Sequence, residues 1–186
     1  MLTCPHCQTP VREDSPICPA PDCKFSLEGV QPLMGAVPLL NVGLTDLSYT
    51  LSDRGKRTLK VAIERFEREL MPSNINVVIN KFDPRYNLSI QLFWLFNSAG
   101  LAPPENRLTN NKDVMIGLDP ELGRIGLIVG YGLEPYVSQE AITSVLKNTT
   151  PLLSEGEYSE ALVQLIEHTK ILLNNCSRIS KEILGI

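Results

Sequence analysis

The chain has 186 residues, of which 43% are hydrophobic, enough for one domain with a buried core and a small additional module. Its 17 lysines and arginines are outnumbered by 21 aspartates and glutamates, so the net charge of -4 excludes a general affinity for nucleic acid. The longest apolar stretch, residues 30–44, is interrupted by prolines and glycines and is too short to cross a membrane. The N-terminal residues lack the pattern of a secretory signal, and we therefore expect a soluble, cytoplasmic protein.

Residues 1–28 contain four of the five cysteines, in the pattern C-x2-C-x10-C-x4-C. The segment has few large aliphatic side chains, so it needs a cross-link to offset its ordering entropy. In a reducing compartment, two short cysteine pairs joined by a loop favour a tetrahedral zinc site over disulfides. We predict a zinc ribbon in which a structural zinc ion is bound by Cys4, Cys7, Cys18 and Cys23. A redox-active or metal-free cluster is the alternative, and His6 is the alternative ligand.

A connecting segment and the first elements of a larger domain follow the ribbon. Residues 29–43 carry two prolines and three glycines and no periodic pattern, which indicates an extended linker. From Asp53 the apolar residues recur at three- and four-residue steps, which predicts a helix that Ser52 or Asp53 caps and Pro72 ends. The β-branched run at residues 75–82, INVVINKF, predicts a buried strand.

The second half of the domain, which we assign to residues 44–186, continues this alternation. An apolar stripe predicts a helix at residues 86–98, and two apolar runs at 113–118 and 124–131, separated by DPELG, predict a β-hairpin. Pro135 suits the first turn of a further helix, and a long last helix is expected to begin near Ser154 or Glu155. Helices that alternate with strands predict an α/β/α sandwich over a mixed sheet.

The domain shows no motif of a known catalytic nucleophile, since it has a single histidine and no phosphate-binding or G-x-S-x-G loop. His168 and Cys176 both lie along the apolar stripe of the last helix, so we interpret them as packing residues. Gly130 and Gly132 stand where a strand ends and a helix begins. Exposed backbone amides there can bind an anion, although glycines at a strand exit are more often turn residues.

Several pieces of the chain resemble, in order, the TPM domain of bacterial membrane-associated proteins and of thylakoid lumen proteins that help to maintain photosystem II. The resemblance runs from Leu44 to Leu173. It rests on TDLSYTLSDRGKRTL, INVVINKF, the hairpin DVMIGLDPELGRIGLIVGYGLEP and PLLSEGEYSEAL, and on the signature Gly-x-Gly-Leu-Glu at residues 130–134. It implies an α/β/α sandwich, and for some members calcium binding and weak acid phosphatase activity.

The resemblance also implies acidic ligands for a cation, since calcium takes oxygen ligands. The candidate residues are Asp46, Asp113 and Glu134, with Asp53 and Asp119 as weaker candidates. Alternatively, Asp53 caps a helix, Asp119 begins a turn and Asp113 flanks a strand. Lys112 beside Asp113 would compete with a bound cation.

Two functions follow from these observations. The first is a non-catalytic binding or assembly factor, because two linked modules raise avidity for a protein complex. The second is a phosphomonoesterase in which Asp46, Asp113 and Glu134 hold a divalent ion that activates water. The second function requires those carboxylates to converge on one ion.

Overall fold

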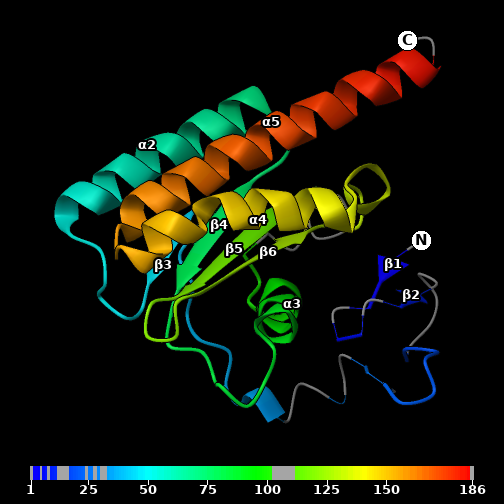
Figure 1. The fold of residues 1–186 in the computed structure, drawn as a ribbon, viewed down its shortest axis with the longest axis horizontal. Coiled ribbons are helices and arrows are strands. Elements are labelled where there is room, and N and C mark those ends of the chain that lie inside the picture. Colours follow the sequence, from blue (N-terminus) through cyan, green and yellow to red (C-terminus); the bar gives the residue numbers. More distant parts are fainter. Residues whose placement is uncertain are drawn as a thin grey trace.

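The computed structural model describes residues 2–4, 6–7, 9–11, 17–23, 25–26, 29, 33–101 and 112–184. Within these ranges the chain forms two sheets. Strands β1 (Leu2–Thr3) and β2 (Pro10–Val11) make a small antiparallel hairpin in the predicted ribbon. The other sheet has four strands and lies in the centre of the larger domain, with helices on both faces (Figure 1).

The four-stranded sheet has the order β3-β4-β5-β6, with β3 (Leu44–Asp46), β4 (Ile75–Ile79), β5 (Val114–Asp119) and β6 (Arg124–Val129). The first three strands are parallel, and β5 and β6 form an antiparallel hairpin in which Val114 pairs with Val129. The sheet is therefore mixed, as predicted. The strand predicted at residues 75–82 already ends at Ile79, and β3 is an additional edge strand that the sequence pattern did not indicate.

Helices α2 (Asp53–Glu69), α4 (Gln139–Ser154) and α5 (Tyr158–Leu184) cover one face of the sheet, and α3 (Leu88–Ser98) covers the other (Figure 1). Alternate residues of the strands supply the two cores, as the pleat of a β-strand requires. On β5, Ile116 packs with α2 and α5, whereas Met115 packs with α3. These three layers confirm the α/β/α sandwich.

The ends of the helices follow local capping signals, with two differences from the predicted bounds. Ser52, not Asp53, caps α2, because its side chain accepts a hydrogen bond from the backbone N–H of Gly55 (3.1 Å). Pro135 lies in a short 3-10 helix, η2 (Glu134–Tyr136), and Ser138 then caps α4. Helix α4 continues through Pro151 to Ser154, so the last helix begins at Tyr158 rather than at residue 154 or 155.

The two parallel crossovers have opposite hands. From β3 to β4 and from β4 to β5 the chain steps in the same direction across the sheet, yet α2 and α3 lie on opposite faces. Two crossovers of the same hand would place both helices on one face. Since nearly all such crossovers are right-handed, one of the two departs from that rule.

Candidate functional site

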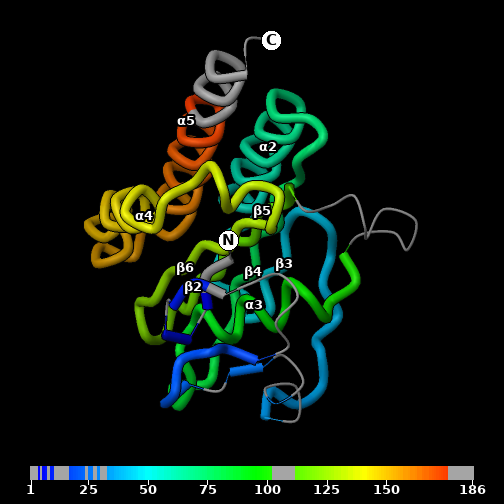
Figure 2. Tube along the Cα trace, turned by 90° about the vertical axis from the view of Figure 1, so that its right-hand side faces the viewer, coloured from blue at the N-terminus to red at the C-terminus, as the bar shows by residue number. Residues whose placement is uncertain are grey.

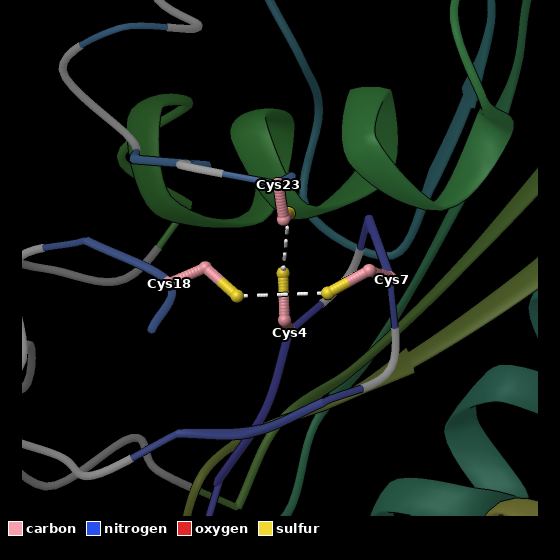
Figure 3. A group of neighbouring side chains, drawn as sticks. All are labelled: Cys4, Cys7, Cys18 and Cys23. Atoms are coloured by element: carbon pink, nitrogen blue, oxygen red, sulfur yellow. Dashed lines mark hydrogen bonds between the residues drawn. The ribbon is translucent and has the colours of Figure 1, made fainter. Parts of the chain in front are cut away.

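The four ribbon cysteines form the clearest candidate site. Figure 3 shows the side chains of Cys4, Cys7, Cys18 and Cys23 pointing toward one another, and their sulfur atoms all lie within 4.8 Å of one another. The Sγ atoms of Cys4 and Cys23 are 3.7 Å apart, and those of Cys7 and Cys18 are 3.5 Å apart. Tetrahedral zinc with bonds of about 2.3 Å would separate its sulfur ligands by about 3.8 Å. The cluster can therefore hold one metal ion.

Two backbone turns bring the cysteines together. The N–H of Cys4 donates to the carbonyl of Thr9 (2.9 Å), which closes the turn between β1 and β2 around Cys7. The N–H of Cys18 donates to the carbonyl of Phe25 (2.8 Å), which closes the turn that contains Cys23. Each turn presents two thiols to the same point, as in structural sites built from two short cysteine pairs.

The thiols differ in how easily they lose a proton. Hydrogen bonding with Thr9 lowers the pKa of Cys7 to about 6, whereas burial raises the pKa of Cys23 to about 12 and that of Cys18 above its usual value. Only thiolates bind zinc, so the buried thiols must lose protons when a metal ion enters.

His6 lies beside the cluster as an outer contact. Its Nδ1 atom is 3.0 Å from Cys23 Sγ, and its ring stacks on Phe25 with the ring centroids 6.4 Å apart. A ring N–H directed at a thiolate sulfur orients and stabilises that ligand without replacing it. The exposed His6 side chain therefore suits a supporting role next to four cysteine ligands.

The ribbon packs against the α3 face of the larger domain. The ring of Phe25 meets that of Phe93 edge to face at 5.9 Å between centroids. Cys4 and Phe93, together with β6, line a hollow of about 120 Å³. Figure 2 shows β2 near α3, and Cys4 shares the hollow with Phe93, so the cysteine cluster lies against the domain.

The candidate cation ligand Asp46 is committed to a turn at the end of β3. Its carboxylate accepts hydrogen bonds from the backbone N–H groups of Thr50 and Leu51, both at 3.1 Å. Lys56 Nζ lies 3.3 Å from Asp46 Oδ2, and the Asp46 side chain is only 3% exposed. This carboxylate anchors the approach to α2.

Asp113 lies at the opposite end of the sheet from Asp46. Asp46 is in register with Ile79 at the end of β4, whereas Asp113 precedes Val114, which pairs with Ile75 at the start of β4. Asp113 accepts hydrogen bonds from the backbone and side-chain nitrogens of Asn74, at 3.1 and 2.9 Å. The structure does not bring these two carboxylates together.

The remaining acidic candidates are divided between the same two ends. Glu134 begins η2, which follows the end of β6. That end of β6 pairs with the start of β5, so Glu134 lies at the same end of the sheet as Asp113. Asp119 lies at the Asp46 end, but two strand spacings away, about 10 Å. It is fully buried and accepts a 2.7 Å hydrogen bond from Arg124 Nη2. Asp53 is exposed in the first turn of α2.

Within the described residues, only the cysteine cluster brings together three or more side chains that could bind one metal ion.

Gly130 and Gly132 form a turn between β6 and η2. The carbonyl of Gly130 accepts from the N–H groups of Leu133 (2.8 Å) and Glu134 (3.3 Å), and the Gly130 N–H donates to the carbonyl of Asp113 (2.8 Å). The N–H groups of Gly130, Leu133 and Glu134 therefore donate to carbonyls of the protein, which favours the turn interpretation over an anion site.

His168 is partly buried on α5, as expected for a boundary residue, and the side chain of Cys176 lies outside the described residues.

A cleft that the sequence did not indicate lies between α4, the β5–β6 hairpin and the loop before α3. It has a volume of about 690 Å³. Among the described residues that line it, Arg85, Arg124 and Lys147 are charged and none carries a carboxylate. These three cations are far apart in the sequence, so no local pattern predicts that they line one cleft. The sequence indicates only that Leu146, Lys147 and Thr150 lie close together on one helix.

The TPM domain profile matches residues 44–170 of the chain. The chain belongs to the TPM domain family. This result confirms the resemblance drawn from the sequence motifs. The match runs from β3 into the first half of α5, and the cysteine cluster precedes it. No curated protein sequence matches the chain significantly.

Solved structures share the TPM fold at low sequence identity. The BA42 protein of the psychrophilic bacterium Bizionia argentinensis is 15% identical, with a TM-score of 0.60, over 70% of this chain and 86% of that protein. The N-terminal domain of a P. gingivalis protein is 20% identical, with a TM-score of 0.60, over 81% and 92% of the two chains. The N-terminal domain of cg2496 from Corynebacterium glutamicum is 14% identical, with a TM-score of 0.51, over 73% and 82%. These similarities support the fold alone.

None of the helices among the described residues combines the length and apolar character needed to cross a bilayer.

Proposed function

We propose that the protein is a non-catalytic binding or assembly factor, in which a zinc-loaded ribbon and the TPM domain dock together on a protein complex. The observation that carries this proposal is the contact between Phe25 of the ribbon and Phe93 of α3. Because aromatic contacts of this kind favour a defined geometry, the two modules present one continuous surface to a partner. Two linked contacts then raise avidity beyond that of either module alone.

Exposed apolar side chains in the segment before α2 support a protein partner. Leu39 is 89% exposed, Val42 71% and Tyr49 86%, and all three lie in the segment that leads from the ribbon to α2. Large exposed apolar groups are costly in water unless a partner covers them. The segment adjoins β3, an edge strand of the sheet, so these side chains offer a partner an apolar edge of the TPM domain.

Zinc is the metal that best suits the cluster, because four thiolates at tetrahedral spacing are typical of structural zinc. A closed four-thiolate site leaves no coordination position for a substrate, which agrees with a docking role. Free thiols that must stay reduced to bind the metal fit a cytoplasmic location.

The phosphomonoesterase alternative has less support. It requires Asp46, Asp113 and Glu134 to share one cation, as oxygen ligands of calcium do at about 2.4 Å. Asp46 and Asp113 instead belong to opposite ends of the sheet, and each already accepts hydrogen bonds from its own surroundings. Calcium therefore has no convergent ligand set among the described residues.

A capture experiment tests the proposal. The full chain and a Cys4→Ser/Cys7→Ser variant serve as baits in native lysate, with bound zinc quantified in each and Cys176→Ser as a control that removes a cysteine outside the ribbon. We expect the wild-type and Cys176→Ser chains to retain zinc and the same partner, and the double variant to lose both. If no bait retains a partner while the chain hydrolyses a phosphate ester in a metal-dependent manner, the enzyme alternative replaces the proposal.

A further inference from the structure

We propose that the cleft between α4 and the loop before α3 binds an extended acidic peptide segment of a partner protein. This inference rests on the proposed binding function, and it names the chemistry of the partner and the place where it binds. The cleft lies on the TPM domain, apart from the cysteine cluster. Its shape, its charge and its apolar floor each contribute to the inference.

The shape of the cleft suits an extended chain. One wall is α4 from Thr143 to Leu153, and the other is the loop from Pro84 to Asn87 together with the β5–β6 hairpin. Ten residues of helix span about 15 Å, which is the length of about four or five residues in an extended peptide. The lining includes Lys147 and Thr150, whose side chains are exposed, so a peptide can enter from solvent without any rearrangement of the wall.

The charge of the cleft is opposite to that of the whole chain. The chain has a net charge of -4, yet all three charged residues that line the cleft, Arg85, Arg124 and Lys147, are cationic. Asp83 and Asp119 partly neutralise Arg85 and Arg124, so Lys147 supplies most of the positive charge that would attract an acidic segment and repel a basic one. Charge complementarity therefore selects the partner.

The three cations are held in different ways. Arg124 Nη2 pairs with the buried Asp119 at 2.7 Å, and the guanidinium also donates to the carbonyls of Tyr86 and Phe82, both at 3.4 Å. Arg85 is 76% exposed and forms a 2.6 Å pair with Asp83, which an incoming carboxylate can replace at little cost. Lys147 takes part in no ion pair within the described part of the chain. Lys147 is therefore the cation most available to a ligand.

The floor of the cleft provides apolar contacts between the cations. Its apolar lining residues come from α3, β6 and α4: Leu88, Ile125, Leu146 and Leu153. An extended peptide directs alternate side chains to opposite sides, so apolar residues can face this floor while acidic residues between them reach the cationic rim. A free small anion would contact only the cationic rim and would leave the apolar floor uncovered. The peptide uses the whole cleft.

Binding of a fluorescein-labelled peptide of alternating Glu and Leu, measured by fluorescence anisotropy on the full zinc-loaded chain, tests the inference. Matched peptides carry Gln or Lys in place of Glu. The diagnostic variant is Lys147→Glu, and the matched control is Lys60→Glu, which reverses an equally exposed lysine on α2. We expect the Glu peptide alone to bind, added salt to weaken it, and Lys147→Glu to weaken it by about tenfold or more while Lys60→Glu does not.

Several results would overturn the inference. Equal binding of the Gln peptide would remove the electrostatic argument, and an equal loss in Lys60→Glu would make the effect one of net charge. If inorganic phosphate displaced the peptide as effectively as an unlabelled Glu peptide, the cleft would be a small-anion site instead. If the capture experiment retained a partner while the Glu peptide did not bind, this inference would fail and the proposed function would stand. If the Glu peptide bound as expected while no bait retained a partner, the cleft assignment would stand and the proposed assembly role would fail.

Discussion

Leu92 of α3 lies directly against Gly117 of β5, so closely that a Cβ atom on this glycine would overlap the leucine methyl groups. Gly117 pairs with Gly126 across the hairpin, and a Cβ atom on Gly126 would be 2.8 Å from Leu92 Cδ1. The two glycines form a flat area on the sheet that receives this leucine. The close approach of α3 thus depends on the absence of two side chains.

We expect Gly117→Ala to destabilise the protein by about 1–3 kcal/mol, because the added methyl group overfills a close-packed core. Urea unfolding monitored by circular dichroism measures this change. Leu92→Ala alone should cost about 2–5 kcal/mol through the cavity it leaves. In the Leu92→Ala background the added cost of Gly117→Ala should shrink, and an undiminished cost would show that Leu92 is not the neighbour that matters.

The cysteine cluster should bind cobalt in place of zinc with the absorption spectrum of a tetrahedral four-thiolate site. Cys18→Ser should abolish that spectrum, because it removes a ligand. His6→Ala should keep it but weaken metal affinity by about 10- to 100-fold, since His6 contacts Cys23 only as an outer partner. Competition with a chromogenic chelator measures the affinity. A changed ligand-field band in His6→Ala would instead make His6 a ligand.

The buried ion pair between Asp119 and Arg124 should be important for stability. Asp119 is fully buried, and it also accepts a hydrogen bond from the N–H of Leu122 (3.2 Å) in the hairpin turn. Asp119→Ala should destabilise the protein by about 3–5 kcal/mol, because it leaves a partly buried guanidinium without its counter-ion. Urea unfolding of Asp119→Ala, Arg124→Leu and the double variant measures the coupling. Additive losses in the double variant would contradict an interaction between the two residues.

Stability should depend on pH through a carboxyl pair near the amino end of β4. Burial, reinforced by the charge of Asp113, raises the pKa of Glu67, and burial raises the pKa of Asp113. A carboxyl group with a raised pKa binds its proton more tightly in the folded state, so its contribution is present at low pH. That contribution is lost as the pH rises through the folded-state pKa.

Glu67→Gln should therefore make the protein more stable relative to wild type as the pH is raised from about 4 to about 7, across the range where carboxyl groups titrate. Urea unfolding at several pH values measures the difference. Glu157→Gln, at an exposed position between α4 and α5, is the control. A difference between Glu67→Gln and wild type that does not change with pH would contradict the assignment.

The elements with strong periodic patterns could be predicted, and those set by distant contacts could not. The β-branched run of β4 and the turn residues of the β5–β6 hairpin are local signals. The first predicted a buried strand, and the second predicted the pairing of β5 with β6. The three residues of β3 are too few to show a period, and they form a strand by pairing in parallel with β4. The opposite hands of the two crossovers leave no trace in local sequence.

The residues of the candidate site also fall into those that a local sequence pattern predicts and those that only distant contacts bring together. The spacing of the ribbon cysteines is a local pattern, so their convergence could be anticipated. The acidic candidates were chosen from motif positions, which carry no information about which end of the sheet each residue occupies. Only the register of β3, β4 and β5 separates Asp46 from Asp113. The cleft likewise arises because α4 packs beside the loop that contains Arg85.

The contact between Phe25 and Phe93 has a consequence for biosynthesis. A chain leaves the ribosome from its N-terminus, so all four ribbon cysteines are exposed before α3 has been made. Metal binding can then supply the folding energy of the ribbon while the rest of the chain is still being translated. We therefore expect the four cysteines to close around a metal ion before Phe93 is available, and the contact between Phe25 and Phe93 to form afterwards.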